Sequence, residues 1–262
     1  MTSEERRWAE AEFACAVERY YAALAEHAVL RADEEEPSLG GMLLYAGELD
    51  GAARALTVAG NVAGAATLAV AENASEAKQA MVDGVVDFVV NTLDEALRIL
   101  KNEVRKRQPV AVCVAAKREL VEAEMHERGV APDLIAAAVA SGAGSGFSGQ
   151  AEAIAPAGCS EAQAMLTWRV EAAPVRWLPV LDGLAATSVG EGARIERRWL
   201  RLAPRFLGRM ARGVRVLRCE PEAAKEFVSR AETAVLRGEI GAPVEMELER
   251  RGVRERYRLT PP

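Results

Sequence analysis

The sequence predicts an α/β protein with a doubly wound, mainly parallel sheet, an N-terminal helix and a smaller C-terminal α+β module. Two observations support this fold class. Short apolar runs alternate with helix-forming runs between residues 42 and 139, and after residue 151 tryptophan appears repeatedly and arginine becomes dense. We expect the helix in residues 1–37, the parallel-sheet domain in residues 38–150 and the C-terminal module in residues 151–262.

The N-terminal helix is predicted from residues 3–30. Apolar residues return there at intervals of three and four, with Glu and Arg between them. An acidic run and Pro37 end the pattern, because proline cannot continue a packed helix. We expect this helix to pack on the sheet or on a second copy of the chain.

The parallel sheet is predicted from strand–helix–strand repeats. Apolar runs at residues 42–45, 67–70 and 85–90 are separated by helix-forming runs at residues 50–62 and 75–82. Asp50 stands at the start of the first helix and is a suitable N-cap. Right-handed crossovers of this kind place the strands side by side and parallel, with the helices on the faces of the sheet.

The same alternation continues beyond residue 90. We expect a helix at residues 94–106, a strand at 110–114, a helix at 117–128 and a fifth parallel strand at 134–139. Residues 141–149 contain four glycines, so this segment is either a flexible linker or a loop whose backbone approaches a ligand closely.

The C-terminal module is predicted to mix strands and helices. We expect strands at residues 165–170 and 214–218, helices at 174–186, 192–210 and 220–237, and a terminal hairpin of residues 243–250 and 253–259. The module is either a separate α+β domain or an extension of the first sheet.

Candidate binding residues lie where the first two predicted strands end. Gly47, Glu48, Asp50 and Gly51 form the first strand-to-helix turn, and Glu72 follows the second strand. In Rossmann-like sheets such a turn points backbone N–H groups at a phosphate, and an acid after the second strand accepts hydrogen bonds from a ribose. The two carboxylates in the turn oppose an anion, so the pattern supports a nucleotide site only in part. The alternative is that Glu72 is a solvated acid that starts the next helix.

Four segments together resemble the central NAD-binding domain of urocanase. They are residues 63–68 (AGAATL), 86–87 (VD), 92–97 (TLDEAL) and 128–133 (RGVAPD), in the order and spacing of that family. The resemblance covers residues 43–135 and implies a Rossmann-like fold that holds NAD, which in the family acts as an electrophile during the hydration of urocanate.

Two segments depart from the urocanase pattern. The glycine-rich turn of the family corresponds to residues 50–54 (DGAAR), and its Thr-Asp-Gln-Thr-Ser segment is replaced by residues 136–140 (AAAVA). We therefore expect a urocanase-type core in a smaller protein that lacks urocanate hydratase activity. If the chain is an enzyme, the resemblance implies a lyase.

A stripe of arginines is a second candidate site. The arginines recur at intervals of three and four, so they share one helix face unless Pro204 divides the segment into two short helices; they are Arg194, Arg198, Arg201, Arg205, Arg209 and Arg212. Such a face either grips phosphate or carboxylate groups of a ligand, a partner or RNA, or it is a solvated surface paired with the protein's acids.

Composition restricts the remaining classes. The net charge of −6 argues against general nucleic-acid binding. Without a membrane-length apolar run or a signal-peptide pattern, we expect a soluble cytoplasmic protein. The scattered cysteines favour reduced thiols and no metal site, although Cys159 would be nucleophilic if a helix began at Glu161.

Three functions follow from these observations. The first is binding of NAD or a related nucleotide at Gly47–Gly51 and Glu72. The second is a non-catalytic ligand-sensing or assembly module, including a homo-oligomer, that kept the fold and lost the chemistry. The third is binding of phosphate or RNA by the arginine stripe.

Overall fold

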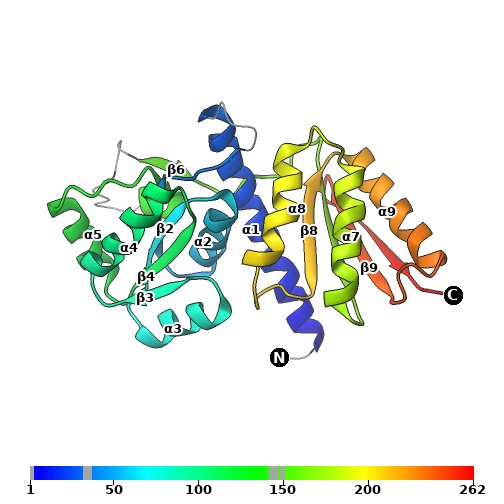
Figure 1. Ribbon diagram of the computed structural model, residues 1–262, viewed down its shortest axis with the longest axis horizontal. Coiled ribbons are helices and arrows are strands. Elements are labelled where there is room, and N and C mark those ends of the chain that lie inside the picture. The colour runs from blue at the N-terminus through cyan, green and yellow to red at the C-terminus, as the bar shows by residue number, and fades with distance from the viewer. Residues whose placement is uncertain (1–2, 32–36, 142–146, 148–150) are drawn as a thin grey trace. The chain divides into compact units, whose positions relative to one another are not determined.

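The computed structural model describes residues 3–31, 37–141, 147 and 151–262 (Figure 1). These residues divide into two compact units. One unit contains residues 19–157 and 206–209, and the other contains residues 1–18, 158–205 and 210–262. The N-terminal helix α1 (Ser3–Arg31) confirms the expected first element, and it contributes residues to both units. No helix in the described ranges is long and apolar enough to cross a membrane.

The first unit is built on a parallel sheet with intervening helices, as predicted. Its strands follow the order β3-β4-β2-β1-β5-β6, and every neighbouring pair is parallel. Its elements in chain order are β1 (Leu43–Glu48), α2 (Gly51–Ala63), β2 (Ala66–Val70), α3 (Ala74–Asp83), β3 (Phe88–Val90), α4 (Leu93–Lys106), β4 (Val110–Val114), α5 (Arg118–Glu127), β5 (Leu134–Ala136), α6 (Ala137–Ala140) and β6 (Glu152–Ile154).

The pairing of β1 with β2 is parallel, and the register runs from Leu43 opposite Ala66 to Glu48 opposite Val70. The alanine-rich helix α2 connects these two strands. Asp50 caps this helix by accepting a hydrogen bond from the Ala53 amide, which confirms the predicted N-cap.

Helices cover both faces of the parallel sheet. Leu44 and Tyr45 are consecutive on β1 and therefore point to opposite faces. A Cβ on Gly60 of α2 would lie 2.9 Å from Leu44 Cδ2, whereas the Tyr45 hydroxyl donates a hydrogen bond to Glu122 of α5. Helices α2 and α5 thus lie on opposite faces of the sheet.

Two ion pairs assign the remaining helices to these faces. Arg54 of α2 pairs with Asp83 of α3, and Arg128, the C-cap of α5, pairs with Asp94 of α4. Helices α2 and α3 therefore share one face, and α4 and α5 share the other. This is the doubly wound arrangement that the sequence predicts.

The fifth strand is shorter than predicted. Strand β5 ends at Ala136, and the next four residues form the short helix α6 rather than continuing the strand to residue 139. Alanine is the strongest helix former, and three of these four residues are alanines. The Ser141 hydroxyl donates a hydrogen bond to the Ala137 carbonyl at the end of the helix. An apolar run alone does not distinguish a strand from a buried turn of helix.

A sixth parallel strand lies beyond the fifth. Strand β6, at residues 152–154, pairs with β5. The parallel sheet therefore includes three residues that lie beyond residue 150, where we expect the parallel-sheet domain to end. The glycine-rich segment between these strands falls largely outside the described residues. Within it, Phe147 is buried and packs edge-on against Tyr45, with ring centroids 5.7 Å apart.

The second unit has an antiparallel sheet of its own, in the order β10-β9-β7-β8, so the C-terminal module does not extend the first sheet. Helices α7 and α9 lie side by side along this sheet (Figure 1). Its elements are β7 (Ala164–Val170), α7 (Pro174–Ser188), α8 (Arg194–Phe206), β8 (Val214–Cys219), α9 (Pro221–Leu236), β9 (Val244–Arg250) and β10 (Val253–Leu259).

The core of the second unit and its hairpin follow from local chemistry. Trp168 of β7 packs edge-on against Phe227 of α9 with centroids 5.0 Å apart, and both side chains are buried. Arg251 and Gly252 both have positive φ, as a two-residue turn between antiparallel strands requires, which confirms the predicted hairpin.

Candidate functional site

The carboxyl ends of β1, β2 and β4 meet at one edge of the parallel sheet. The Leu49 amide donates to the Val70 carbonyl over 2.8 Å, and the Ala71 amide donates to the Val114 carbonyl over 3.0 Å. The segments that follow these strands therefore start next to one another. Ligands of doubly wound sheets bind at this edge.

Gly47 lies in a bulge at the end of β1. The pairing register with β2 shifts between Tyr45 and Gly47, and Gly47 has a φ of 78°, in the left-handed region that favours glycine. A Cβ at this position would lie 2.6 Å from Cγ2 of Val139 in α6. The missing side chain of Gly47 thus lets α6 pack against β1, and the bulge sets the direction of Glu48.

Glu48 connects the ends of the first two strands. Its Oε1 accepts a hydrogen bond from the Glu72 backbone amide over 3.1 Å. The carboxylate of Glu48 therefore lies beside the backbone of the residue that the sequence assigns to ribose binding.

Asp50 and Gly51 form the start of α2. Asp50 Oδ1 accepts a hydrogen bond from the Ala53 amide over 2.8 Å, so its negative charge sits at the positive end of the helix. Gly51 is exposed, and a Cβ there would meet nothing within 4 Å. The amides of Gly51 and Ala52 are the first two of the helix, which have no intrahelical acceptor in α-helical geometry.

Glu72 lies at a topological switch point. After β2 the chain enters α3 on one face, and after the neighbouring β4 it enters α5 on the opposite face. Adjacent strands whose connections diverge in this way leave a crevice between them. Glu72 follows β2 and Lys117 precedes α5, and Lys117 Nζ lies 3.4 Å from Glu72 Oε1. Both side chains are more than half exposed, so solvent and ligands reach this pair.

A partly buried polar cluster lies below the same region, between β1 and α5. The Tyr45 hydroxyl donates to Glu122 Oε1 over 3.1 Å, and Arg118 Nε donates to the same oxygen over 2.7 Å. Burial and the nearby Glu122 carboxylate raise the pKa of Tyr45, so its hydroxyl remains a hydrogen-bond donor. Cys113 is buried within β4, and burial together with Glu48 raises the pKa of its thiol to about 12.

This arrangement fits one part of a dinucleotide better than another. An exposed carboxylate after β2 suits the hydroxyls of a ribose. The carboxylates of Glu48 and Asp50 do not suit a diphosphate, because each already accepts a backbone N–H of the kind that a phosphate binds in a Rossmann turn. The guanidinium of Arg54, in the first turn of α2, is paired with Asp83.

Four arginines of the predicted stripe, Arg194, Arg198, Arg201 and Arg205, lie on α8, whereas Arg209 and Arg212 lie in the turn that follows it. Arg194, Arg201 and Arg205 are exposed, whereas Arg198 is buried. Pro204 lies inside the helix without ending it, and α8 stops at Phe206, short of the residue 210 that the sequence predicted.

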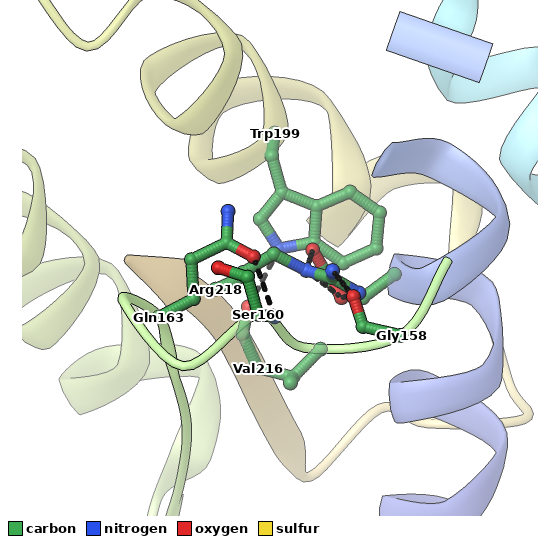
Figure 2. Close-up of polar contacts among 7 residues, drawn as sticks. Gly158, Ser160, Gln163, Trp199, Val216 and Arg218 are labelled. Carbon is green, nitrogen blue, oxygen red and sulfur yellow. Dashed lines mark hydrogen bonds and ion pairs between the residues drawn. The ribbon is translucent and has the colours of Figure 1, made fainter. Parts of the chain in front are cut away.

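The second unit contains a buried ion pair between Arg218 of β8 and Glu18 of α1. Arg218 Nε and Nη2 bond the Glu18 carboxylate at 3.0–3.1 Å, and Nη1 donates to the Gly158 carbonyl. Figure 2 shows Arg218 between Gly158 and the indole of Trp199, whose Nε1 donates to the Val216 carbonyl over 2.6 Å. All the nitrogens of the guanidinium are engaged with the protein, which indicates a structural role.

Cys159 does not meet the condition set for a nucleophile. Residues 161 and 162 form a turn, and the chain then enters β7, so no helix N-terminus follows the thiol. The exposed Cys159 therefore lacks the electropositive helix end that would lower its pKa. In the described part of the chain, no group of three or more His, Cys, Asp or Glu residues could hold a metal ion.

Sequence reasoning missed Lys117 and the Tyr45–Glu122–Arg118 cluster. Lys117 follows the strand at residues 110–114 as Glu72 follows the strand at residues 67–70, so a comparison of the residues after each predicted strand would have found it. Arg118 and Glu122 have the i, i+4 spacing of a helical ion pair, but no local pattern links Glu122 to Tyr45, which is 77 residues away.

Comparison with protein families agrees with this geometry. The Rossmann-like domain of urocanase matches residues 19–159, which is more than half of the chain. The match includes every element of the parallel sheet and the residues at its carboxyl edge.

Proposed function

The chain belongs to the urocanase Rossmann-like domain family, and from this premise we propose that residues 19–159 bind NAD or a related ligand of the nucleotide class. The ligand lies at the carboxyl edge of the sheet, in the crevice between β2 and β4. Glu72 accepts hydrogen bonds from the ribose hydroxyls, and Lys117 lies on the other side of the crevice.

The position of Glu72 carries this proposal. Its carboxylate follows β2, is largely exposed and stands at the point where the connections from neighbouring strands diverge. The only cation that pairs with it among the described ion pairs, Lys117, is itself exposed and on a flexible side chain. A diol can therefore displace Lys117 at small cost, since exposed ion pairs contribute little stability.

We further propose that the protein is a binding module that does not hydrate urocanate. The segment that follows β5 consists of alanines and Val139, whose side chains cannot donate or accept a proton. This segment packs against the end of β1 through Val139 and Gly47. The segment after β5 thus offers no side chain for the proton transfer that hydration requires.

The test is calorimetric titration of the full chain with adenosine, AMP and NAD⁺. At least one of the three should bind, and Glu72→Ala should weaken that binding about tenfold or more, as expected when a charged acceptor of two ribose hydroxyls is removed. Glu72→Gln should have a smaller effect because it keeps one acceptor oxygen.

Glu232→Ala is the matched control, because Glu232 is an exposed glutamate on α9 in the other unit. The control should leave binding unchanged. Absence of binding by all three compounds, or equal binding by the parent and Glu72→Ala, would overturn the proposal. Turnover of urocanate by the protein supplied with NAD⁺ would overturn the statement about hydration.

A further inference from the structure

The carboxyl edge of the parallel sheet carries an excess of negative charge. Glu48, Asp50 and Glu72 are within this edge, and Lys117 is the cation paired with it, which gives these four side chains a formal charge of −2. Arg54 starts near the same turn, but its guanidinium is paired with Asp83 of α3.

Two of these carboxylates occupy positions that a phosphate takes in other Rossmann-like turns. Glu48 accepts a hydrogen bond from the amide of Glu72, two residues after β2, and Asp50 accepts one from the third amide of α2. The Asp50 bond places a negative charge at the N-terminus of α2, and the Glu48 bond places a second one beside the backbone of Glu72. The turn therefore supplies its own anions and satisfies the amides of Ala53 and Glu72 without a ligand.

We propose that, among ligands of the nucleotide class, this site favours a neutral or cationic ribonucleoside and binds a diphosphate, such as that of NAD, more weakly. The inference rests on the proposed function, because it concerns the same crevice and the same acceptor, Glu72. The ribose is held by Glu72, and the base extends along the crevice toward Lys117 and the end of β4. A diphosphate attached to the ribose would be directed at the turn and repelled by Glu48 and Asp50.

The charges, rather than the shape of the turn, cause this selectivity. Gly51 leaves open space beside the turn, so no side chain at that position blocks a phosphate. Replacement of the two carboxylates by amides should therefore restore the anion site without rebuilding the backbone.

The variant Glu48→Gln/Asp50→Asn is designed for this purpose. Asparagine is as good an N-cap as aspartate, and its side-chain oxygen still accepts the Ala53 amide. After Glu48→Gln, the oxygen of the new side-chain amide still accepts the backbone N–H of Glu72. The variant thus removes two charges and keeps both hydrogen bonds, and its circular dichroism and melting temperature verify that it folds.

The experiment compares adenosine with ADP, which share the base and ribose and differ in the diphosphate. At low salt the parent should bind adenosine about tenfold more tightly than ADP. Added salt should reduce this ratio of affinities, because it screens the repulsion between the carboxylates and the diphosphate. In the Glu48→Gln/Asp50→Asn variant the two affinities should become about equal, or ADP should bind more tightly than adenosine. Glu226→Gln/Glu232→Gln, which removes two charges from α9 in the other unit, should leave the ratio unchanged.

The outcomes separate this inference from the proposed function. Tighter binding of ADP than of adenosine by the parent, or an unchanged ratio in Glu48→Gln/Asp50→Asn, would overturn the charge selectivity while the binding site stands. If neither compound binds the parent and neither binds the variant, the proposed function itself is wrong, and the inference falls with it.

Discussion

Arg218 and Glu18 form a buried ion pair across 200 residues of sequence, with both side chains less than a tenth exposed. The pair joins the middle of α1 to β8 of the antiparallel sheet, and the same guanidinium donates a hydrogen bond to the carbonyl of Gly158. Burial makes each charge depend on its partner, because an unpaired charge in this position would lose its hydration without compensation.

Arg218→Met should therefore destabilise the second unit by about 3–5 kcal/mol, since it leaves the Glu18 carboxylate buried without its cation. The double variant Glu18→Leu/Arg218→Met should recover most of this loss. All four tryptophans of the chain, Trp8, Trp168, Trp177 and Trp199, belong to this unit, so tryptophan fluorescence during urea denaturation follows its unfolding.

Arg230→Met provides the matched control for Arg218. Arg230 pairs with Glu226 on the exposed side of α9, and both side chains are more than 40% exposed. Its removal should cost less than about 1 kcal/mol. If Arg218→Met and Arg230→Met lower the free energy of unfolding equally, the buried pair does not stabilise the second unit more than an exposed pair does.

Two helical glycines should respond to alanine with opposite signs. A Cβ at Gly60 would lie 2.6 Å from Thr67 Oγ1 and 2.9 Å from Leu44 Cδ2, so Gly60→Ala forces α2 away from the sheet and should cost about 1–3 kcal/mol. Gly183 lies in α7 with nothing within 4 Å, so Gly183→Ala should stabilise by about 0.5–1 kcal/mol. Urea denaturation followed by circular dichroism measures both, and destabilisation by the two substitutions alike would contradict the packing at Gly60.

The sequence predicted the elements of the first sheet well because local rules determine them. The N-cap at Asp50, the apolar strand at residues 110–114 and the parallel pairing of β1 with β2 all depend on short segments or on the handedness of crossovers. Helix α6 was missed because four apolar residues have no periodicity that distinguishes helix from strand.

The site was predicted less completely, because its contacts are long-range. The position of Glu72 follows from the strand it ends, but its neighbours Glu48 and Lys117 are 24 and 45 residues away in sequence. Arg198 belonged to a predicted exposed stripe by spacing, and its burial depends on how α8 packs, which the period of a helix does not specify.

Thiol reactivity should separate the cysteines by burial. Cys159 is exposed, whereas Cys113 and Cys219 are buried and burial raises the pKa of each thiol to about 12. The thiolate is the reactive form, so a disulfide reagent at pH 8 should modify Cys159 in the folded protein and reach Cys113 and Cys219 only after unfolding. Cys159→Ala should remove the fast phase of thiol modification. If a fast phase persists in this variant and mass spectrometry traces it to Cys113 or Cys219, the assigned burial is contradicted.

Burial of Cys219 should also make the second unit less stable at alkaline pH. Burial, with smaller contributions from Glu196 and Glu18, raises the pKa of Cys219 from 9.0 to about 12. Above pH 9 the thiol of the unfolded chain ionises while that of the folded chain stays protonated, so the unfolded state binds fewer protons and stability falls as the pH rises. This contribution is fully present below pH 9 and should cost about 1 kcal/mol at pH 10.

Cys219→Ala isolates this effect from the other groups that titrate in the same range. Its stability, measured by tryptophan fluorescence in urea, should decline less than that of the parent between pH 8 and pH 10, whatever the cost of the substitution at pH 8. Cys159→Ala, which changes an exposed thiol, should decline as the parent does. Parallel declines in the parent and in Cys219→Ala would mean that the Cys219 thiol ionises as readily in the folded unit as in the unfolded chain.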